Sequence, residues 1–100
     1  MRFVFIVYPE TREEEVRSML DAAGAGGWTE FRHLIGRGTT GQRLGSTIWP
    51  GQNGACLAAV SDETVDMVTV LLREAREDWE ATHKAPFNVH AYVMPCEQLV

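Results

Sequence analysis

The stretch Phe3-Val4-Phe5-Ile6-Val7-Tyr8 is an unbroken run of aromatic and β-branched side chains, and Pro9 ends it. No polar residue alternates with the apolar ones, which is typical of a strand whose two faces are both buried. We therefore predict a central strand of a sheet here. This is the longest apolar run, and it is far shorter than the ~20 residues of a membrane-spanning helix, so we expect a chain that does not cross a membrane.

Two helices are predicted, one on each side of the middle of the chain. The first runs from about Thr11 to Ala23, because Thr11 and Glu14 have the spacing of a capping box and glycines follow Ala23. The second runs from about Asp62 to Ala81, where apolar residues recur on one helical face. Ser61, followed by two acidic residues, is the predicted N-cap of this second helix.

Three further strands complete the pattern: Trp28 to Ile35, Ala55 to Val60 and Phe87 to Met94. The order strand, helix, strand, strand, helix, strand is that of a ferredoxin-like α+β (βαββαβ) domain, an antiparallel sheet with two helices on one face. At 100 residues we expect a single domain over 1–100. Since the first and third strands are apolar on both faces, we infer that self-association covers the face without helices.

Composition excludes several classes of protein. Apolar residues make up 45% and charged residues 23%, as in an ordinary globular domain, and the net charge of -5 argues against nucleic-acid or anionic-membrane binding. The two cysteines, Cys56 and Cys96, form no paired motif, and no signal-peptide pattern opens the chain. We therefore expect reduced thiols and a cytoplasmic location.

The segment Gly36 to Gly54 contains six of the nine glycines, so we predict turn or loop over most of it. Between Phe31 and Ser61 there is no acidic residue but three arginines, which gives this part a charge of +3. Glycine-rich backbone with guanidinium groups suits phosphate, carboxylate or bicarbonate. The candidate ligand-binding residues are Gly36, Arg37, Gly38, Thr39, Thr40, Gly41, Gln42 and Arg43, which match neither a P-loop nor a dinucleotide fingerprint. The alternative is a solvated hairpin loop whose arginines only pair with acidic residues.

Other candidate sites are less well supported by spacing. The stretch Trp49 to Gly54 is either a rigid aromatic turn or the wall of a ligand cleft. The histidines and cysteines have no metal-ligand spacing, and Cys56 lies in an apolar run that is typical of an inert thiol; these residues are His33, His83, His90, Cys56 and Cys96. We therefore expect no metal site and no catalytic residue.

The chain resembles the PII-like branch of the nitrogen-regulatory PII superfamily over nearly its whole length. The resemblance is carried by the order of the six elements and by four stretches of sequence. These are Thr29-Glu30-Phe31 leading to Gly36-Arg37-Gly38-Thr39-Thr40-Gly41, then Gly45-Ser46, then Trp49-Pro50-Gly51-Gln52-Asn53, and the ending Tyr92-Val93-Met94-Pro95-Cys96-Glu97.

This resemblance implies a non-enzymatic regulator that is a homotrimer with its sheets facing inward. It also implies that a small anionic effector, a nucleotide or bicarbonate, binds in clefts between subunits. The residues at matching positions are Gly36 to Gly41 at the base of a long loop, here 37–53, together with Lys84; Arg43 is a further candidate. In PII proteins this loop docks onto a membrane transporter, an enzyme or another partner protein.

Two other classes remain open at this point. One is a CutA-like trimeric metal-binding protein on the same fold, which would use His33, His83, His90 or Cys96. The other is a small dimeric α+β-barrel enzyme, which also pairs such sheets face to face, although the sequence offers no acid-base pair for it.

Overall fold

The computed structural model describes residues 1–38, 41–43 and 52–100, with only the backbone described at 37–38 and 41–43. Its helices and strands follow one another as β1 (Arg2–Pro9), η1 (Glu10–Arg12), α1 (Glu13–Ala22), β2 (Thr29–Leu34), β3 (Gly36–Gly38), β4 (Gly41–Arg43), β5 (Asn53–Val60), α2 (Asp62–Thr82) and β6 (His90–Pro95).

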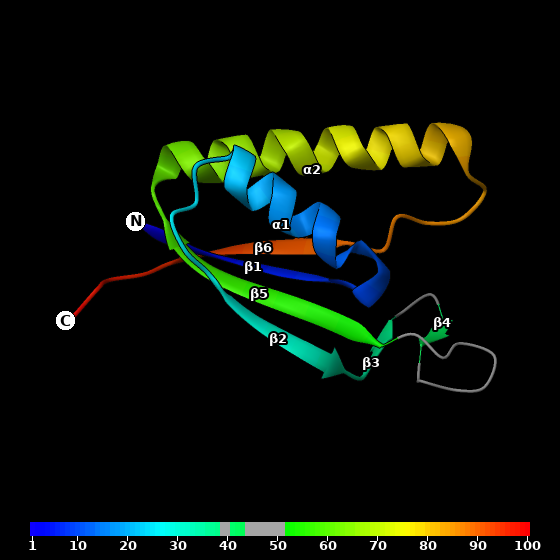
Figure 1. Ribbon diagram of the computed structural model, residues 1–100, viewed down its shortest axis with the longest axis horizontal. Helices are drawn as coiled ribbons and strands as arrows, with labels where there is room; N and C mark the ends of the chain where they lie inside the picture. Colours follow the sequence, from blue (N-terminus) through cyan, green and yellow to red (C-terminus); the bar gives the residue numbers. More distant parts are fainter. Residues whose placement is uncertain (39–40, 44–51) are drawn as a thin grey trace.

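Four strands form the main sheet, in the order β2-β5-β1-β6, and every pair is antiparallel. The helices α1 and α2 both lie over one face of this sheet (Figure 1). The ferredoxin-like α+β prediction is therefore confirmed, as is the central position of the first strand, because β1 pairs with β5 on one side and β6 on the other.

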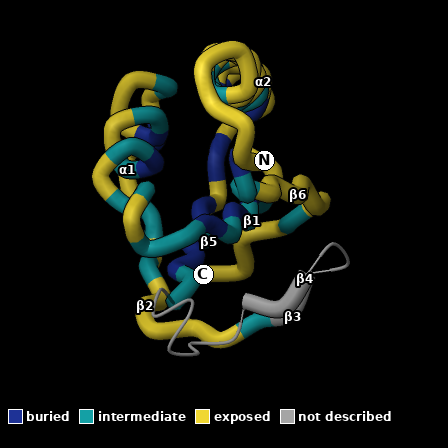
Figure 2. The backbone as a smooth tube through the Cα atoms, turned by 90° about the vertical axis from the view of Figure 1, so that its right-hand side faces the viewer, coloured by how far each residue is buried: buried dark blue, intermediate teal, exposed yellow. Residues whose placement is uncertain are grey.

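The core lies between the helices and the sheet. Val4, Ile6 and Tyr8 of β1 face it and are almost fully buried, which follows from the two-residue period of a strand. They pack with buried apolar residues of the other elements, namely Val16, Leu20, Cys56, Ala58, Val60, Val65 and Val68. Figure 2 shows these buried segments enclosed between the two helices and the strands.

The opposite face of the sheet is apolar and has no helix over it. Phe5 of β1 lies directly opposite Leu57 of β5 and Tyr92 of β6, and Phe3 lies opposite Met94. Tyr92 is 56% exposed in the single chain. The pattern of apolar residues on both faces, read from the sequence, is thus present in the structure.

The predicted capping box of the first helix is wrong. Thr11 lies inside the 3₁₀ turn η1, and the residue before α1 is Arg12, which makes no side-chain cap. A residue within a 3₁₀ turn lacks the extended backbone of an N-cap, so the sequence spacing alone was misleading. The helix ends at Ala22, one residue before the predicted Ala23, and a glycine follows it: Gly24 has φ +88°, and the Ala25 N–H donates to the Leu20 carbonyl in a Schellman motif.

The second helix begins where the sequence predicts. The Ser61 hydroxyl accepts a hydrogen bond from the Thr64 N–H at 3.2 Å, so Ser61 is the N-cap of α2. The helix extends one residue beyond the predicted end, to Thr82. Neither α1 nor α2, the α-helices in the described part of the chain, has the length and apolar character needed to cross a membrane.

The boundaries of all four strands of the main sheet differ from the predictions, by one to three residues. The last strand starts at His90 rather than Phe87, because Asn88 has φ +64° and interrupts the extended backbone. The third strand of the main sheet, β5, starts at Asn53 rather than Ala55.

The predicted loop between Gly36 and Gly54 is partly a β-hairpin. Strands β3 and β4 pair antiparallel within it, with Gly38 opposite Gly41. A glycine-rich sequence does not predict paired strands at this point, because glycine is depleted in β-strands. Residues 39–40 and 44–51, including Trp49, lie outside the described part of the chain.

Candidate functional site

The predicted ligand-binding residues fall on two segments. Gly36, Arg37 and Gly38 form β3, and Gly41 and Arg43 belong to β4, so the strand register brings these five into one two-stranded ribbon. Arg37 is opposite Gln42, and Arg43 is opposite Gly36. Thr39 and Thr40 are outside the described residues.

Lys84 lies elsewhere, in the exposed connection between α2 and β6. This connection and the β3–β4 hairpin are at the same end of the molecule (Figure 1). The structure thus places the backbone of both predicted parts of the site at one end of the molecule.

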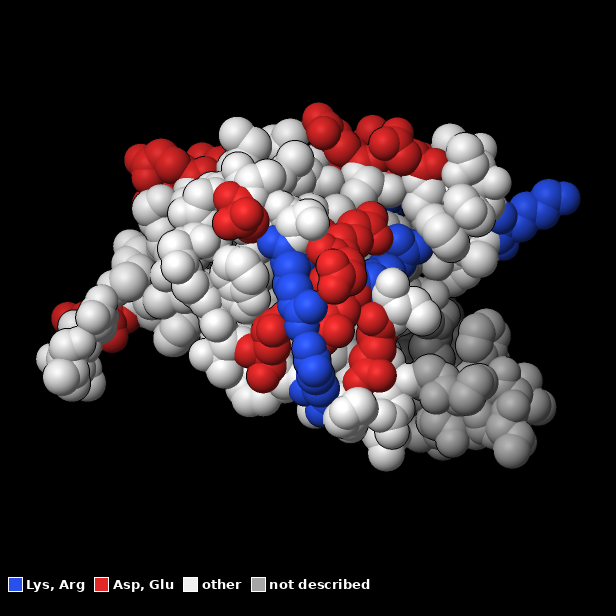
Figure 3. All heavy atoms as spheres, in the orientation of Figure 1, with Lys and Arg blue, Asp and Glu red and all other residues white. Residues whose placement is uncertain are grey.

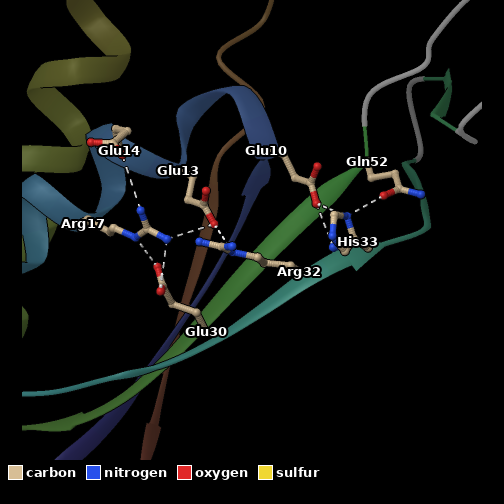
Figure 4. A network of polar contacts seen from close by, with 8 residues as sticks. All are labelled: Glu10, Glu13, Glu14, Arg17, Glu30, Arg32, His33 and Gln52. Carbon is tan, nitrogen blue, oxygen red and sulfur yellow. Dashed lines mark hydrogen bonds and ion pairs between the residues drawn. The ribbon is translucent and has the colours of Figure 1, made fainter.

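A hydrogen-bonded tie joins the residues on either side of 34–51, which we call the hairpin segment. The His33 N–H donates to Glu10 Oε1 at 2.7 Å, and the His33 Nδ1 lies 3.0 Å from the same oxygen. The His33 ring nitrogen is also 2.9 Å from Gln52 Oε1, and the Glu10 N–H donates to the Gln52 carbonyl at 2.9 Å. Figure 4 shows Glu10 and Gln52 on either side of the His33 ring. Residues before and after the segment are therefore anchored to the same turn, η1.

His33 can make these contacts because of its backbone. It has φ +59°, and the pairing of β2 with β5 shifts register between Phe31 and Leu34. A bulge of this kind redirects a side chain out of the regular alternation of the strand. A bulge leaves no regular pattern in the sequence, so the sequence analysis did not predict the tie.

Next to the tie, two arginines are neutralised by acidic residues of the same chain. Arg32 Nε lies 2.8 Å from Glu13 Oε1, and Arg17 Nε donates to Glu30 Oε1 at 2.6 Å. Figure 3 shows acidic side chains on both sides of a band of basic ones on this face. Arg32 thus pairs with an acid of the same chain, whereas the side chains of Arg37 and Arg43, to which the hairpin-loop alternative applies, lie outside the described residues.

The Arg17–Glu30 pair also sets the charge state of this region. The hydrogen bond from Arg17 lowers the pKa of the Glu30 carboxyl, and the same bond raises the pKa of the Arg17 guanidinium. The pair therefore favours the charged form of both groups.

The connection that carries Lys84 is fixed by aromatic contacts. The His83 ring stacks on Trp79 with the ring centroids 3.5 Å apart, and Trp79 Nε1 donates to the Ala85 carbonyl at 2.8 Å. The Arg12 guanidinium lies 4.1 Å from the Trp79 ring centroid and 4.3 Å from that of Phe87. These cation–π contacts link η1 to the connection.

The candidate metal ligands are not brought together. His33 lies beside Glu10, His83 stacks on Trp79, His90 begins β6, and Cys96 follows β6. Within residues 1–38, 41–43 and 52–100, no group of three or more His, Cys, Asp or Glu residues could hold a metal ion.

The Cys56 thiol is inert packing. It is 1% exposed in the core, and burial raises its pKa to about 11. Its thiolate form is therefore scarce at neutral pH, which disfavours a nucleophilic role.

Comparison with known proteins identifies the fold. No protein-family model and no curated protein matches the sequence. Among solved structures, CPII from Thiomonas intermedia bound to ADP, AMP and acetate matches with a TM-score of 0.68 and 19% identity, over 93% of this chain and 82% of that one. CPII bound to ADP, AMP and bicarbonate matches with a TM-score of 0.66 and 23% identity, over 93% and 86%.

A PII-like protein from Thermus thermophilus has a TM-score of 0.58 and 25% identity, over 92% of this chain and 82% of its own. These matches agree with the sequence resemblance and with the order of the strands and helices. The chain therefore has the fold of the PII-like proteins.

Proposed function

We propose that this protein is a non-enzymatic PII-like regulator that binds a small anionic effector, a nucleotide or bicarbonate, between the subunits of a homotrimer. The observation that carries this proposal is the match over 93% of the chain to CPII, whose structures contain ADP, AMP and bicarbonate. The charge pattern supports it, since the hairpin segment contains arginines and no acidic residue.

The apolar face of the sheet supports the trimer. Phe5, Leu57 and Tyr92 form a continuous row across three strands, and Phe3 and Met94 form a second row. An apolar surface of this extent is normally covered by another protein surface. Assembly through this face would leave α1 and α2 in contact with solvent.

The effector is held, in this proposal, by the base of the hairpin, Arg37 and Arg43, together with Lys84. These cations lie on two segments at one end of the folded molecule. A cleft between neighbouring subunits would therefore allow both segments to contact one anion. Guanidinium groups bind carboxylate and phosphate oxygens in a bidentate manner.

The response to the effector is proposed to involve the segment 37–53, acting on a partner protein such as a transporter or an enzyme. The tie of His33, Glu10 and Gln52 fixes both ends of this segment. Because the ends are fixed, an anion bound at Arg37 would select among conformations of the residues between them. Both cysteines are free, in keeping with the proposed cytoplasmic location.

Calorimetric titration with ADP, AMP, ATP and bicarbonate tests the proposal. We expect at least one of these ligands to bind, and a ligand at 100 times its Kd to raise the stability of the native state by about 2.7 kcal/mol. Arg37→Ala should weaken binding at least tenfold while the trimer mass is unchanged.

Arg32→Ala is the matched control. It removes the same charge from the same acid-free segment, but at a residue that already pairs with Glu13. Equal losses of affinity in both variants would indicate a general charge effect, and full affinity in Arg37→Ala would overturn the site assignment. If none of the four ligands bound, the proposed effector class would be overturned.

A further inference from the structure

A groove lies between α2 and β6 on the helix-covered side of the sheet, with a volume of about 240 Å³. It is distinct from the proposed effector site, since neither Lys84 nor Gly36 is among the described residues that line it. The lining residues come from β1, α2, the connection to β6, and β6 itself, and most of these residues are apolar; the apolar members are Val4, Val65, Val68, Leu72, Phe87, Val89, Ala91 and Val93.

One face of α2 forms a wall of the groove. Val65, Val68, Thr69 and Leu72 follow the helical spacing of three and four residues. The Thr69 hydroxyl donates to the Val65 carbonyl at 2.8 Å, so the polar atom of this wall is already bonded within the helix. The groove therefore has the character of an apolar slot.

Two arginines continue the same helical stripe. Arg73 and Arg76 also line the groove and both are exposed, and none of the described residues that line it is acidic. Among the ion pairs of the described residues, none involves Arg73 or Arg76. Glu77 and Glu80 follow them by four residues, but an acid C-terminal to the base is the weaker arrangement of such a pair.

An apolar slot with two guanidinium groups at one end has a definite chemical complement. We propose that this groove binds a small organic anion that consists of an apolar chain ended by a carboxylate or a phosphate. The chain would lie against the valines of α2 and β6, and the anionic group would contact Arg73 and Arg76. The volume is below the ~300 Å³ of sites for drug-sized ligands, which favours a short chain.

Octanoate is the first probe, and 1-octanol is its neutral counterpart. Calorimetric titration of the full-length protein should show octanoate binding at least tenfold more tightly than 1-octanol, because only the carboxylate pairs with arginine. Monooctyl phosphate forms a second arm: the tighter of the two anions identifies which acid the groove prefers.

The double variant Arg73→Met/Arg76→Met removes the two positive charges but keeps side chains that cover the apolar surface of the groove. Arginine stems also cover apolar surface without any ligand, and methionine retains that role. We expect the double variant to bind octanoate at least tenfold more weakly and to bind 1-octanol unchanged. Arg2→Met is the matched control, because Arg2 pairs with Asp62 outside the groove and its loss should change octanoate affinity less than twofold.

Ala91→Leu tests where the apolar chain of the ligand lies, without changing the charge of the protein. Ala91 lines the groove, so a larger side chain there should reduce octanoate affinity at least fivefold. Neither variant should change titrations with ADP or bicarbonate, which distinguishes this site from the effector site. Equal binding of octanoate and 1-octanol, or unchanged octanoate affinity in the double variant, would overturn the proposal.

Discussion

At the residue scale, Cys56 and Cys96 differ in their surroundings. Cys56 is buried with a pKa raised to about 11, whereas Cys96 is partly exposed after β6. At pH 8 only about one Cys56 in 1,000 is then a thiolate. We predict that Ellman's reagent labels Cys96 alone in the native protein and labels both thiols after unfolding. Rapid labelling of a native Cys96→Ser variant would show that the Cys56 thiol is accessible.

Gly54 is required where β5 passes Tyr8. A Cβ atom at Gly54 would lie 2.8 Å from Tyr8 Cε2, and Tyr8 is 1% exposed, with burial raising its pKa to about 12. Because the Tyr8 ring is part of the buried core, moving it away from a Cβ at Gly54 would displace its neighbours. We therefore predict that Gly54→Ala lowers the free energy of unfolding by about 1–3 kcal/mol, measured by urea denaturation.

Gly26→Ala is the control for this prediction. A Cβ at Gly26 meets no atom within 4 Å, so the substitution should leave the urea midpoint nearly unchanged. If Gly54→Ala were as stable as Gly26→Ala, the close approach of Tyr8 to β5 would be contradicted.

At the element scale, the Arg17–Glu30 pair joins α1 to β2. Because the pKa of Glu30 is lowered in the folded state, the pair stabilises the fold above the ordinary Glu value of 4.5 and this stabilisation is lost as pH falls through the folded pKa. We predict that Glu30→Gln has a lower Tm than the parent at pH 7 and that the difference shrinks below pH 4.5. Thermal unfolding followed by circular dichroism between pH 7 and pH 3 measures this.

The exposed residue Glu74 on α2 provides the comparison. It makes no ion pair within the described residues, so the Glu74→Gln variant should follow the pH profile of the parent protein. A gap between parent and Glu30→Gln that stays constant down to pH 3 would show that Glu30 acts through packing rather than charge.

At the scale of the whole molecule, the uncovered sheet face predicts assembly. Tyr92 lies on this face in the edge strand β6, opposite Phe5. We predict that Tyr92→Glu converts the proposed trimer to monomers and leaves the circular dichroism spectrum unchanged, because the carboxylate would have to be desolvated in the interface. Light scattering coupled to size-exclusion chromatography measures the mass.

Met67 allows the two faces to be compared. It is an exposed apolar residue of α2, 47% accessible, on the opposite side of the sheet. Met67→Glu should retain the mass of the parent protein. Dissociation by Met67→Glu rather than by Tyr92→Glu would place the interface on the helices.

The sequence predicted more of the fold than of the site. Unbroken apolar runs and apolar periodicity located each strand of the main sheet and both α-helices, because burial of a strand or of one helix face leaves a pattern that is visible locally. The predictions were wrong where the local backbone conformation does not follow the side-chain pattern. These places are the 3₁₀ turn at Thr11, the left-handed backbone at Asn88, and the hairpin formed by glycine-rich β3 and β4.

For the candidate site, the sequence pointed to the chemical types but not to the contacts. The absence of acids around Arg37 and Arg43 is a local property and could be read directly. The tie of His33 to Glu10 joins residues 23 apart, and the neutralisation of Arg32 by Glu13 joins residues 19 apart. Neither pair has a spacing that marks it, because each depends on how α1 and η1 sit against β2.

The sequence by itself thus determined the order of the elements, the central place of Phe3 to Tyr8 and the apolar character of both faces of the sheet. These properties follow from local patterns of side chains. The tertiary structure alone decided which arginines are neutralised, how His33 closes the hairpin segment, and that Arg73 and Arg76 border an apolar groove. Such arrangements arise from strand register and helix packing, which bring together residues that no local pattern connects.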